Sequence, residues 1–288
     1  MAIKLITDSC CDLKYNYLLQ NDIIVKQMTF RFKDMELSDD LGQTYDYKEF
    51  YNALREGEMA STAQVNAFTF EEEFEKQIKE GNSIIYIGIS SALSGTYNSA
   101  CIAKEEIIEK YPDADISIVD SKCASMGIGL LLYYVNEMIK SHKRKDEIVS
   151  WIESNKLKIN HWFTVEDLNH LHRGGRVSKT AATMGSLLNI KPILKVDDEG
   201  RLISVGKVKG RKKSITSLLN SMEENIVNPE EQVIFISHGD CLEEAEILKE
   251  KIKEKINVKD IIINYIGPAV GTHSGPGTIA LFFLGNKR

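Results

Sequence analysis

Residues 87–100 read IGISSALSGTYNSA and are unusually rich in hydroxyl side chains. They follow an apolar run and precede a helical pattern, so Ser94, Gly95 and Thr96 fall at a strand-to-helix turn. Hydroxyl groups at such a turn can act as a nucleophile, bind a phosphate or donate hydrogen bonds to another anion. Each of these uses leaves its own pattern in the surrounding residues.

The nucleophile interpretation centres on Ser94. A hydrolase nucleophile elbow reads Gly-x-Ser-x-Gly, whereas residues 92–96 read ALSGT and lack the first glycine. His273 and many acidic residues are present, so a serine hydrolase that uses Ser94 and His273 stays open as an alternative. The structural alternative is that a turn hydroxyl caps the helix that begins near Thr96.

A second candidate is the glycine-rich loop expected at residues 267–277, which contains His273. Its glycines allow either a close backbone approach to a ligand or a turn with positive φ. The chain contains neither Gly-x-x-x-x-Gly-Lys-Ser/Thr nor a Gly-x-Gly-x-x-Gly that follows a strand. These absences disfavour a phosphate-binding loop of a familiar kind.

The sequence RGGR at residues 173–176 is the most distinctive basic element. Two guanidinium groups separated by glycines allow side-chain and backbone donors to converge on one anion. The alternative is a solvated turn whose arginines pair with nearby acids. The same positive charges would repel a cation from His170 and His172, so we expect no metal site.

Composition narrows the class of protein. The 288 residues are 43% hydrophobic and 27% charged with a net charge of −6, which is typical of a globular protein and disfavours a general nucleic-acid binder. We see no signal peptide and no apolar run that approaches the ~20 residues of a membrane span. The five cysteines lack Cys-x-x-Cys spacing. We therefore expect a cytoplasmic protein with reduced thiols.

The basic run at residues 207–213 is either a solvated face or a docking surface for an acidic partner or an anionic membrane.

The elements that must position these residues follow a repeated pattern in the first half. Short apolar runs near residues 3–6, 84–89 and 116–119 end in hydroxyl or carboxylate groups, and helices are predicted over residues 97–111 and 127–141. Strands joined by helical crossovers form a parallel sheet, and ligands bind beyond the carboxyl ends of its strands. We therefore expect the site at this edge.

The second half of the chain is predicted to combine a hairpin with strand–helix–strand elements. The pattern predicts a strand at 161–165, a helix at 166–172, a hairpin of 192–196 with 202–205, a crossover unit from 233 to 266 and a closing strand at 279–284. The predicted fold class is α/β with two closely packed lobes. The first, residues 1–156, carries a parallel Rossmann-like sheet. The second, residues 157–288, is a mixed α/β lobe with a hairpin, and a ligand tunnel lies between or beside the lobes.

Taken together, these segments resemble the DegV family, the fatty-acid-binding proteins that serve as lipid-carrying (FakB-type) subunits of bacterial fatty acid kinase. The resemblance spans nearly the whole chain. Any one motif would be weak evidence for the family, but the ordered set of motifs is highly specific to it. The matching motifs, in the family's order, are TDS at 7–9, STAQ at 61–64, SSALSGTYNSA at 90–100, VDS at 119–121, RGGR at 173–176 and GTHSGPG at 271–277. The family commonly has Thr-Ser-Gln-Pro at the second motif, so the second-motif hydroxyl is either Ser61 or Thr62.

The resemblance implies a site for the carboxylate of one long-chain fatty acid. Its implied donors are Thr62, Ser94, the backbone N–H of Gly95, and His273. The further candidates are Ser61, Thr96, Arg173 and Thr272. Arg173 would lie near the carboxyl end, where the kinase partner approaches.

The resemblance also implies a protein that is not an enzyme by itself and holds no cofactor. An ATP-binding kinase subunit would phosphorylate the carboxyl group, and the acyl-phosphate would pass to an acyltransferase of phospholipid synthesis, with transient contact at the membrane surface. Neutral hydroxyl donors and a histidine, in place of a buried arginine, would leave the carboxylate nucleophilic. The alternatives are a lipid-sensing regulatory module and the serine hydrolase. Chain length, saturation and oligomeric state stay open.

Overall fold

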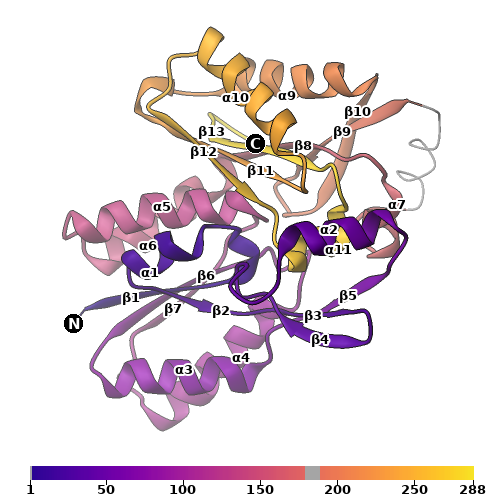
Figure 1. The fold of residues 1–288 in the computed structure, drawn as a ribbon. Helices are drawn as coiled ribbons and strands as arrows, with labels where there is room; N and C mark the ends of the chain where they lie inside the picture. The colour runs from indigo at the N-terminus through magenta and orange to yellow at the C-terminus, as the bar shows by residue number, and fades with distance from the viewer. Residues whose placement is uncertain (1, 179–188) are drawn as a thin grey trace.

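The computed structural model describes residues 2–178 and 189–288, and it stacks two α/β layers (Figure 1). In the view of Figure 1 a six-stranded sheet lies above a four-stranded sheet, and helices cover the outer face of each. Helix α5 (Met126–Lys140) lies between the sheets and contacts strands of both. The covering helices are α9 (Arg211–Asn225) and α10 (Leu242–Lys255) above, and α3 (Ala67–Lys79) and α4 (Thr96–Lys110) below.

The four-stranded sheet is entirely parallel, which confirms the predicted Rossmann-like lobe. Its strand order is β2-β1-β6-β7. Strand β6 is buried along its whole length, as expected for a parallel strand covered on both faces. The strands are β2 (Ile23–Lys26), β1 (Ile3–Asp8), β6 (Ser83–Gly88) and β7 (Ile116–Asp120), and helices α1 (Tyr15–Gln20) and α6 (Lys145–Asn155) complete this lobe.

A small antiparallel sheet in the first half was not predicted. Its strands are β4 (Met35–Ser38), β3 (Thr29–Phe32) and β5 (Ala60–Ala63), each only four residues long. Its core is aromatic: Phe30 and Phe32 pack against helix α2 (Tyr47–Arg55). These strands are too short to show a clear alternation in the sequence, but β5 carries Ser61 and Thr62.

The six-stranded sheet is mixed, with the order β10-β9-β8-β13-β11-β12. The predicted hairpin is confirmed as the antiparallel pair β9–β10, and the predicted crossover unit as the parallel pair β11–β12. The strands are β8 (Ile159–Thr164), β9 (Ile190–Val196), β10 (Leu202–Lys209), β11 (Val233–His238), β12 (Asp260–Tyr265) and β13 (Ile279–Leu284).

Two predicted elements differ from the structure. Residues 267–277 were expected to be a loop, but helix α11 (Pro268–Ser274) forms there. A proline at the first helical position suits a helix start, and Gly275 with φ +79° ends the helix. Helix α7 (Asn169–Arg173) is shorter than the predicted 166–172 helix and begins three residues later.

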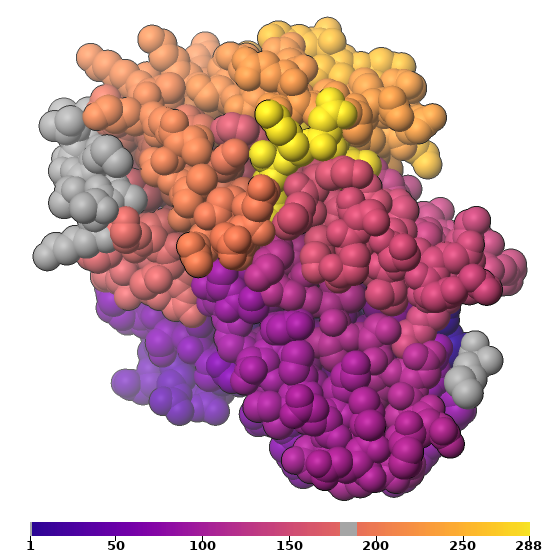
Figure 2. Space-filling model, turned by 180° about the vertical axis from the view of Figure 1, so that it is seen from behind, coloured from indigo at the N-terminus to yellow at the C-terminus, as the bar shows by residue number. Residues whose placement is uncertain are grey.

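The two lobes are closely packed, as predicted. One continuous hydrophobic core contains residues of both, including Ile87 and Phe282. Seen from behind, the yellow chain end lies against orange and magenta segments (Figure 2). In the same contact between the lobes, the Arg288 guanidinium donates to the carbonyl oxygens of Lys122 (2.8 Å) and Asp197 (2.9 Å). The division of the chain at residues 156 and 157 stays a prediction.

Candidate functional site

A cavity of about 200 Å³ lies where the two lobes meet. Most of its wall is apolar and comes from both lobes: Met28, Ile89, Leu93, Phe163, Leu171, Val196, Leu202, Ile266, Ala269, Val270, Ala280 and Phe282. A second, outer pocket of about 240 Å³ shares Thr62, Arg176 and His273 with this cavity. These three residues therefore form a polar wall between an apolar interior and an outer pocket.

Thr62 and His273 form the centre of the polar wall. A hydrogen bond of 2.8 Å joins Thr62 Oγ1 to His273 Nε2, and it connects β5 with α11 across 211 positions of the sequence. Neighbouring side chains of a strand point to opposite faces. Ser61 is accordingly exposed and lines only the outer pocket, whereas Thr62 lines both spaces. Of the two alternatives for the second motif, Thr62 lies at the cavity.

The environment of His273 keeps its imidazole neutral. Burial lowers the pKa of His273 to about 4, and the nearby positive charge of Arg176 acts in the same direction. A neutral imidazole has one donor and one acceptor nitrogen. His273 can thus take part in a hydrogen-bond network at neutral pH without adding a positive charge.

Ser94 and Gly95 lie on the cavity wall at the start of α4. Ser94 Oγ is 2.9 Å from Thr96 Oγ1 and accepts a bond of 3.3 Å from the backbone N–H of Thr96. Ser94 therefore caps this turn, as the structural alternative predicted, and also faces the cavity. The N-terminus of a 15-residue helix adds a partial positive charge that favours an anion.

A side chain at position 95 would displace the end of the Gln64 side chain. A Cβ atom there would lie 2.0 Å from Oε1 of Gln64, another residue of the cavity wall. Thr96, by contrast, is fully buried, and its Oγ1 accepts from the backbone N–H of Val65 at 3.3 Å. Thr96 supports the turn and is not among the residues that line the cavity.

The structure brings together no nucleophile–base pair at Ser94. Ser94 bonds to Thr96 and His273 bonds to Thr62; within residues 2–178 and 189–288 no hydrogen bond joins Ser94 to His273. A serine hydrolase needs its base within hydrogen-bond reach of the nucleophile. This geometry disfavours the hydrolase alternative.

The two arginines of the RGGR segment occupy different places. Arg173 is exposed, lines the outer pocket and donates to His170 Nδ1 at 3.2 Å. Thr272 also lines the outer pocket, but its Oγ1 donates to the carbonyl of Pro268 at 2.8 Å. Arg176 is half-buried and lines both the cavity and the outer pocket. Arg176 was not among the candidate site residues, although it belongs to the RGGR motif that the sequence analysis singled out.

Comparison with known proteins shows the family of this chain. A family model described as "Uncharacterised protein, DegV family" matches residues 2–286. The chain belongs to the DegV family. DegV domain-containing protein CPE0026 of Clostridium perfringens is 54% identical over 282 residues, which are 98% of this chain and 97% of that protein.

Two solved structures extend the comparison. DegV of Bacillus subtilis, described as a fatty acid binding protein, is 27% identical with a TM-score of 0.85, over 99% of this chain and 100% of that chain. Protein TM841 of Thermotoga maritima, whose structure is described as revealing a fatty acid binding function, is 28% identical with a TM-score of 0.84, over 99% of each chain. Both share the fold of this DegV-family chain.

Helix α11 of this DegV-family chain is held in place by two buried carboxyl groups from the first half. Asp12 accepts a bond of 2.8 Å from the N–H of Gly267, and Asp39 accepts one of 3.0 Å from the N–H of Ala269. Both pairs lie at the start of α11, where a helix has unpaired N–H groups. Burial raises the pKa of Asp12 well above its ordinary value and that of Asp39 to about 7. These residues position His273 without lining the polar wall.

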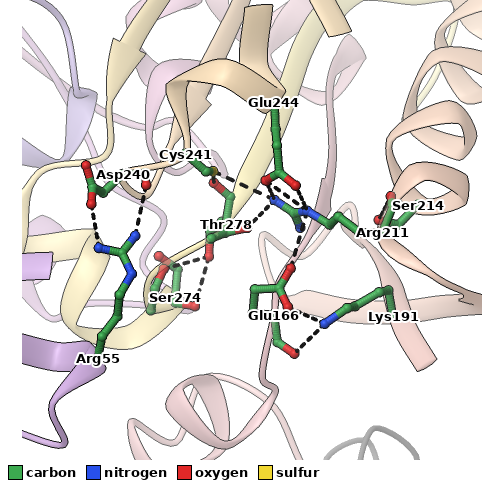
Figure 3. Close-up of polar contacts among 12 residues, drawn as sticks. Arg55, Glu166, Lys191, Arg211, Ser214, Asp240, Cys241, Glu244, Ser274 and Thr278 are labelled. Carbon is green, nitrogen blue, oxygen red and sulfur yellow. Dashed lines mark hydrogen bonds and ion pairs between the residues drawn. The ribbon is translucent and has the colours of Figure 1, made fainter. Parts of the chain in front are cut away.

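An ion-pair cluster holds the backbone that follows α11 (Figure 3). Arg211 donates to both carboxylate oxygens of Glu244 and to the carbonyl of Gly277 at 2.5 Å, and it lies 3.3 Å from Glu166. Thr278 Oγ1 donates to the carbonyl of Ser274 at 2.9 Å. The cluster therefore fixes the second end of the segment that carries His273.

The polar ends of the parallel strands lie at one edge, but their contacts are mainly structural. Asp8 is fully buried and accepts from the Tyr86 hydroxyl at 2.8 Å, and Ser91 Oγ donates to Asp120 at 2.5 Å. Among the described residues, no group of three or more His, Cys, Asp or Glu side chains could hold a metal ion. The described helices include none that is long and apolar enough to cross a membrane.

We predict that Gly174→Ala disturbs the polar wall. A Cβ atom at this position would lie 2.3 Å from His273 Nδ1, so the imidazole must move and its bond to Thr62 is lost. Loss of one such hydrogen bond corresponds to about 1 kcal/mol, or roughly a fivefold weaker affinity for a fatty acid. Fluorescence titration with a fatty-acid probe measures this change.

Gly206→Ala serves as the matched control, because the nearest atom to a Cβ there is 4.0 Å away. We expect it to bind the probe like the wild type. Equal affinity of the Gly174→Ala and Gly206→Ala variants would contradict the assigned contact between Gly174 and His273.

Proposed function

We propose that this protein binds one long-chain fatty acid, with the alkyl chain in the apolar cavity and the carboxylate at the polar wall. The observation that carries the proposal is the position of Thr62, Gly95 and His273 on the wall of a largely apolar cavity. An alkyl chain gains about 0.8 kcal/mol for each buried methylene. The descriptions of the B. subtilis and T. maritima proteins as fatty-acid binders support the same ligand class.

Within this proposal the donors to the carboxylate are the Thr62 and Ser94 hydroxyls, the N–H of Gly95 and a neutral His273. The α4 N-terminus adds to their attraction for an anion. The protein acts without catalysing a reaction by itself. In the cytoplasm an ATP-binding kinase subunit phosphorylates the carboxyl group, and the acyl-phosphate passes to an acyltransferase during a transient contact at the membrane surface.

The position of the outer pocket supports an approach of the kinase from that side of the polar wall. It adjoins Thr62 and His273 from outside the cavity, and Arg173 is exposed at its wall. A phosphoryl donor that enters there reaches the carboxylate without displacing the alkyl chain. Arginine is suited to phosphate because its planar fork donates two parallel hydrogen bonds.

Organic extraction of the purified protein, followed by mass spectrometry, tests the proposed ligand. We expect one fatty acid per chain. A protein that is empty, and that takes up no fatty acid from solution, would overturn the proposal. A fluorophosphonate probe is expected to leave Ser94 unlabelled, whereas labelling would support the hydrolase instead.

We predict that His273→Ala lowers phosphorylation of the bound acid roughly fivefold, because one positioning hydrogen bond contributes about 1 kcal/mol. Binding changes less, since the alkyl chain supplies most of the affinity. The assay follows radioactive phosphate from ATP to the lipid in the presence of the kinase subunit. Phosphorylation by His273→Ala and Ser94→Ala at the wild-type rate would contradict these roles. A wild-type protein that binds the acid but never becomes a substrate would indicate a lipid sensor.

A further inference from the structure

Ser274 carries a buried hydroxyl group that lines the apolar cavity and has no hydrogen-bond partner. It is the last residue of α11 and is 6% exposed. Its backbone carbonyl accepts a bond of 2.9 Å from Thr278 Oγ1 (Figure 3), but its own Oγ bonds to no atom of the described residues. Buried polar side chains almost always have a partner, so this hydroxyl needs an explanation.

The other hydroxyl, amide, imidazole and guanidinium groups on the wall of the cavity have partners within the chain. The hydroxyl groups with partners are those of Thr62, Ser94, Ser125 and Thr278. The remaining groups with partners are those of Gln64, His161, Arg176 and His273. Among the described residues, the hydroxyl of Ser274 is therefore the one group of these kinds on the wall that lacks a partner.

The helix that carries Ser274 offers one local way to satisfy a hydroxyl group. A serine or threonine in a helix can donate to the backbone carbonyl four residues earlier. Thr272 on the same helix does so, because its Oγ1 donates to the carbonyl of Pro268 at 2.8 Å. Ser274 Oγ forms no such bond, so its hydrogen-bonding capacity is left for the occupant of the cavity.

The chemistry of that occupant decides whether Ser274 is satisfied. Water can hydrogen-bond to a polar group on a cavity wall before a lipid enters. An unsubstituted alkyl chain displaces such water and has no donor or acceptor, so it leaves the hydroxyl of Ser274 unpaired at a cost in free energy. A chain that carries its own hydroxyl group at this place gives both groups a partner.

The position of Ser274 indicates where on the chain that hydroxyl group belongs. Ser274 directly follows His273 and lines only the cavity, whereas Thr62, Arg176 and His273 also line the outer pocket. It therefore lies on the inner side of the polar wall. With the carboxylate at the polar wall, the chain carbons nearest to Ser274 are the first ones after the carboxylate.

We propose that Ser274 determines specificity for a fatty acid that carries a hydroxyl group on carbon 2 or carbon 3. This inference rests on the proposed function and defines its ligand class more closely. A serine hydroxyl both donates and accepts, so it can pair with the hydroxyl group of the chain in either direction. Because Ser274 lies on one wall of the cavity, one enantiomer of such an acid binds more tightly than the other.

The test compares tetradecanoate with both enantiomers of 2-hydroxytetradecanoate and 3-hydroxytetradecanoate, by equilibrium dialysis against the delipidated full chain. The wild type is expected to bind one of these hydroxy acids at least as tightly as tetradecanoate. In Ser274→Ala the affinity for that hydroxy acid, relative to tetradecanoate, falls about fivefold. The affinity for tetradecanoate itself stays the same or rises, because no hydroxyl group is left unpaired.

Two controls separate this effect from a general change in the protein. The acid 14-hydroxytetradecanoate carries its hydroxyl group at the far end of the chain, so its affinity relative to tetradecanoate is expected to be the same in the wild type and Ser274→Ala. Ser217→Ala removes a hydroxyl group on the outer helix α9 that donates to the carbonyl of Lys213 at 3.0 Å. It is expected to leave every ratio unchanged.

An equal loss of affinity for all the acids in Ser274→Ala would show that Ser274 acts on the fold or on the carboxylate, and it would overturn the inference. An unchanged ratio for every 2-hydroxy and 3-hydroxy acid would overturn it as well. In both cases binding of tetradecanoate by the wild type leaves the proposed function standing. If the wild type binds none of these acids, the proposed function itself fails.

Discussion

Replacement of Ala280 by phenylalanine is expected to lower the affinity for a long-chain fatty acid about a hundredfold. Ala280 lies on β13, is 6% exposed and lines the cavity beside Phe282. A benzyl group there takes the space of roughly four methylenes, each worth about 0.8 kcal/mol, for a total of about 3 kcal/mol. Phenylalanine is favourable in strands, so β13 is expected to form normally. Acids shorter by several methylenes should lose less affinity.

Leu281→Phe provides the control on the same strand. Leu281 is on the opposite face of β13 and packs in a separate core beneath α9 and α10. Overpacking there lowers the free energy of unfolding by about 1–3 kcal/mol but leaves the cavity open. The measurements are the amount of acid extracted per chain and the affinity in titration. An Ala280→Phe protein that carries a full complement of long-chain acid would show that the chain binds elsewhere.

Asp39→Asn is expected to remove a large part of the pH dependence of stability. Burial is the main cause that raises the pKa of Asp39 to about 7, and the negative charge of Asp40 adds to it. In the unfolded chain its pKa is the ordinary value of 3.8. Between these two values the folded protein keeps a proton that the unfolded chain has released. Stability therefore falls as the pH rises from about 4 to about 7.

Because the pKa of Asp39 is raised in the folded protein, the free energy of unfolding falls by about 2 kcal/mol between pH 5.5 and pH 7.5. Asparagine still accepts the bond from Ala269 but carries no charge, so the loss disappears in Asp39→Asn. Urea unfolding at both pH values measures it. Asp34→Asn, at an exposed position whose φ of +61° asparagine tolerates, should keep the wild-type dependence. An unchanged slope in Asp39→Asn would refute the role assigned to this carboxyl group.

The parallel sheet, the hairpin and the crossover unit could be predicted because their signals are local. An apolar run such as residues 84–89 followed by polar residues indicates a buried strand and its carboxyl end. The strands of the small sheet, including β5, are four residues long and carry no such signal. Helix α11 was missed because its start depends on Asp12 and Asp39, which are more than 200 positions away.

The sequence by itself determined which residue types were available and in what order: the hydroxyls near Ser94, the RGGR segment, His273 in a glycine-rich segment, and the family to which they point. Only the tertiary structure decided which of them meet. It placed Thr62 rather than Ser61 beside His273, and it put Arg176 on the wall of the cavity. The reason is that residues 211 positions apart come together only through the packing of the small sheet and α11 between the two lobes, and no local pattern records that packing.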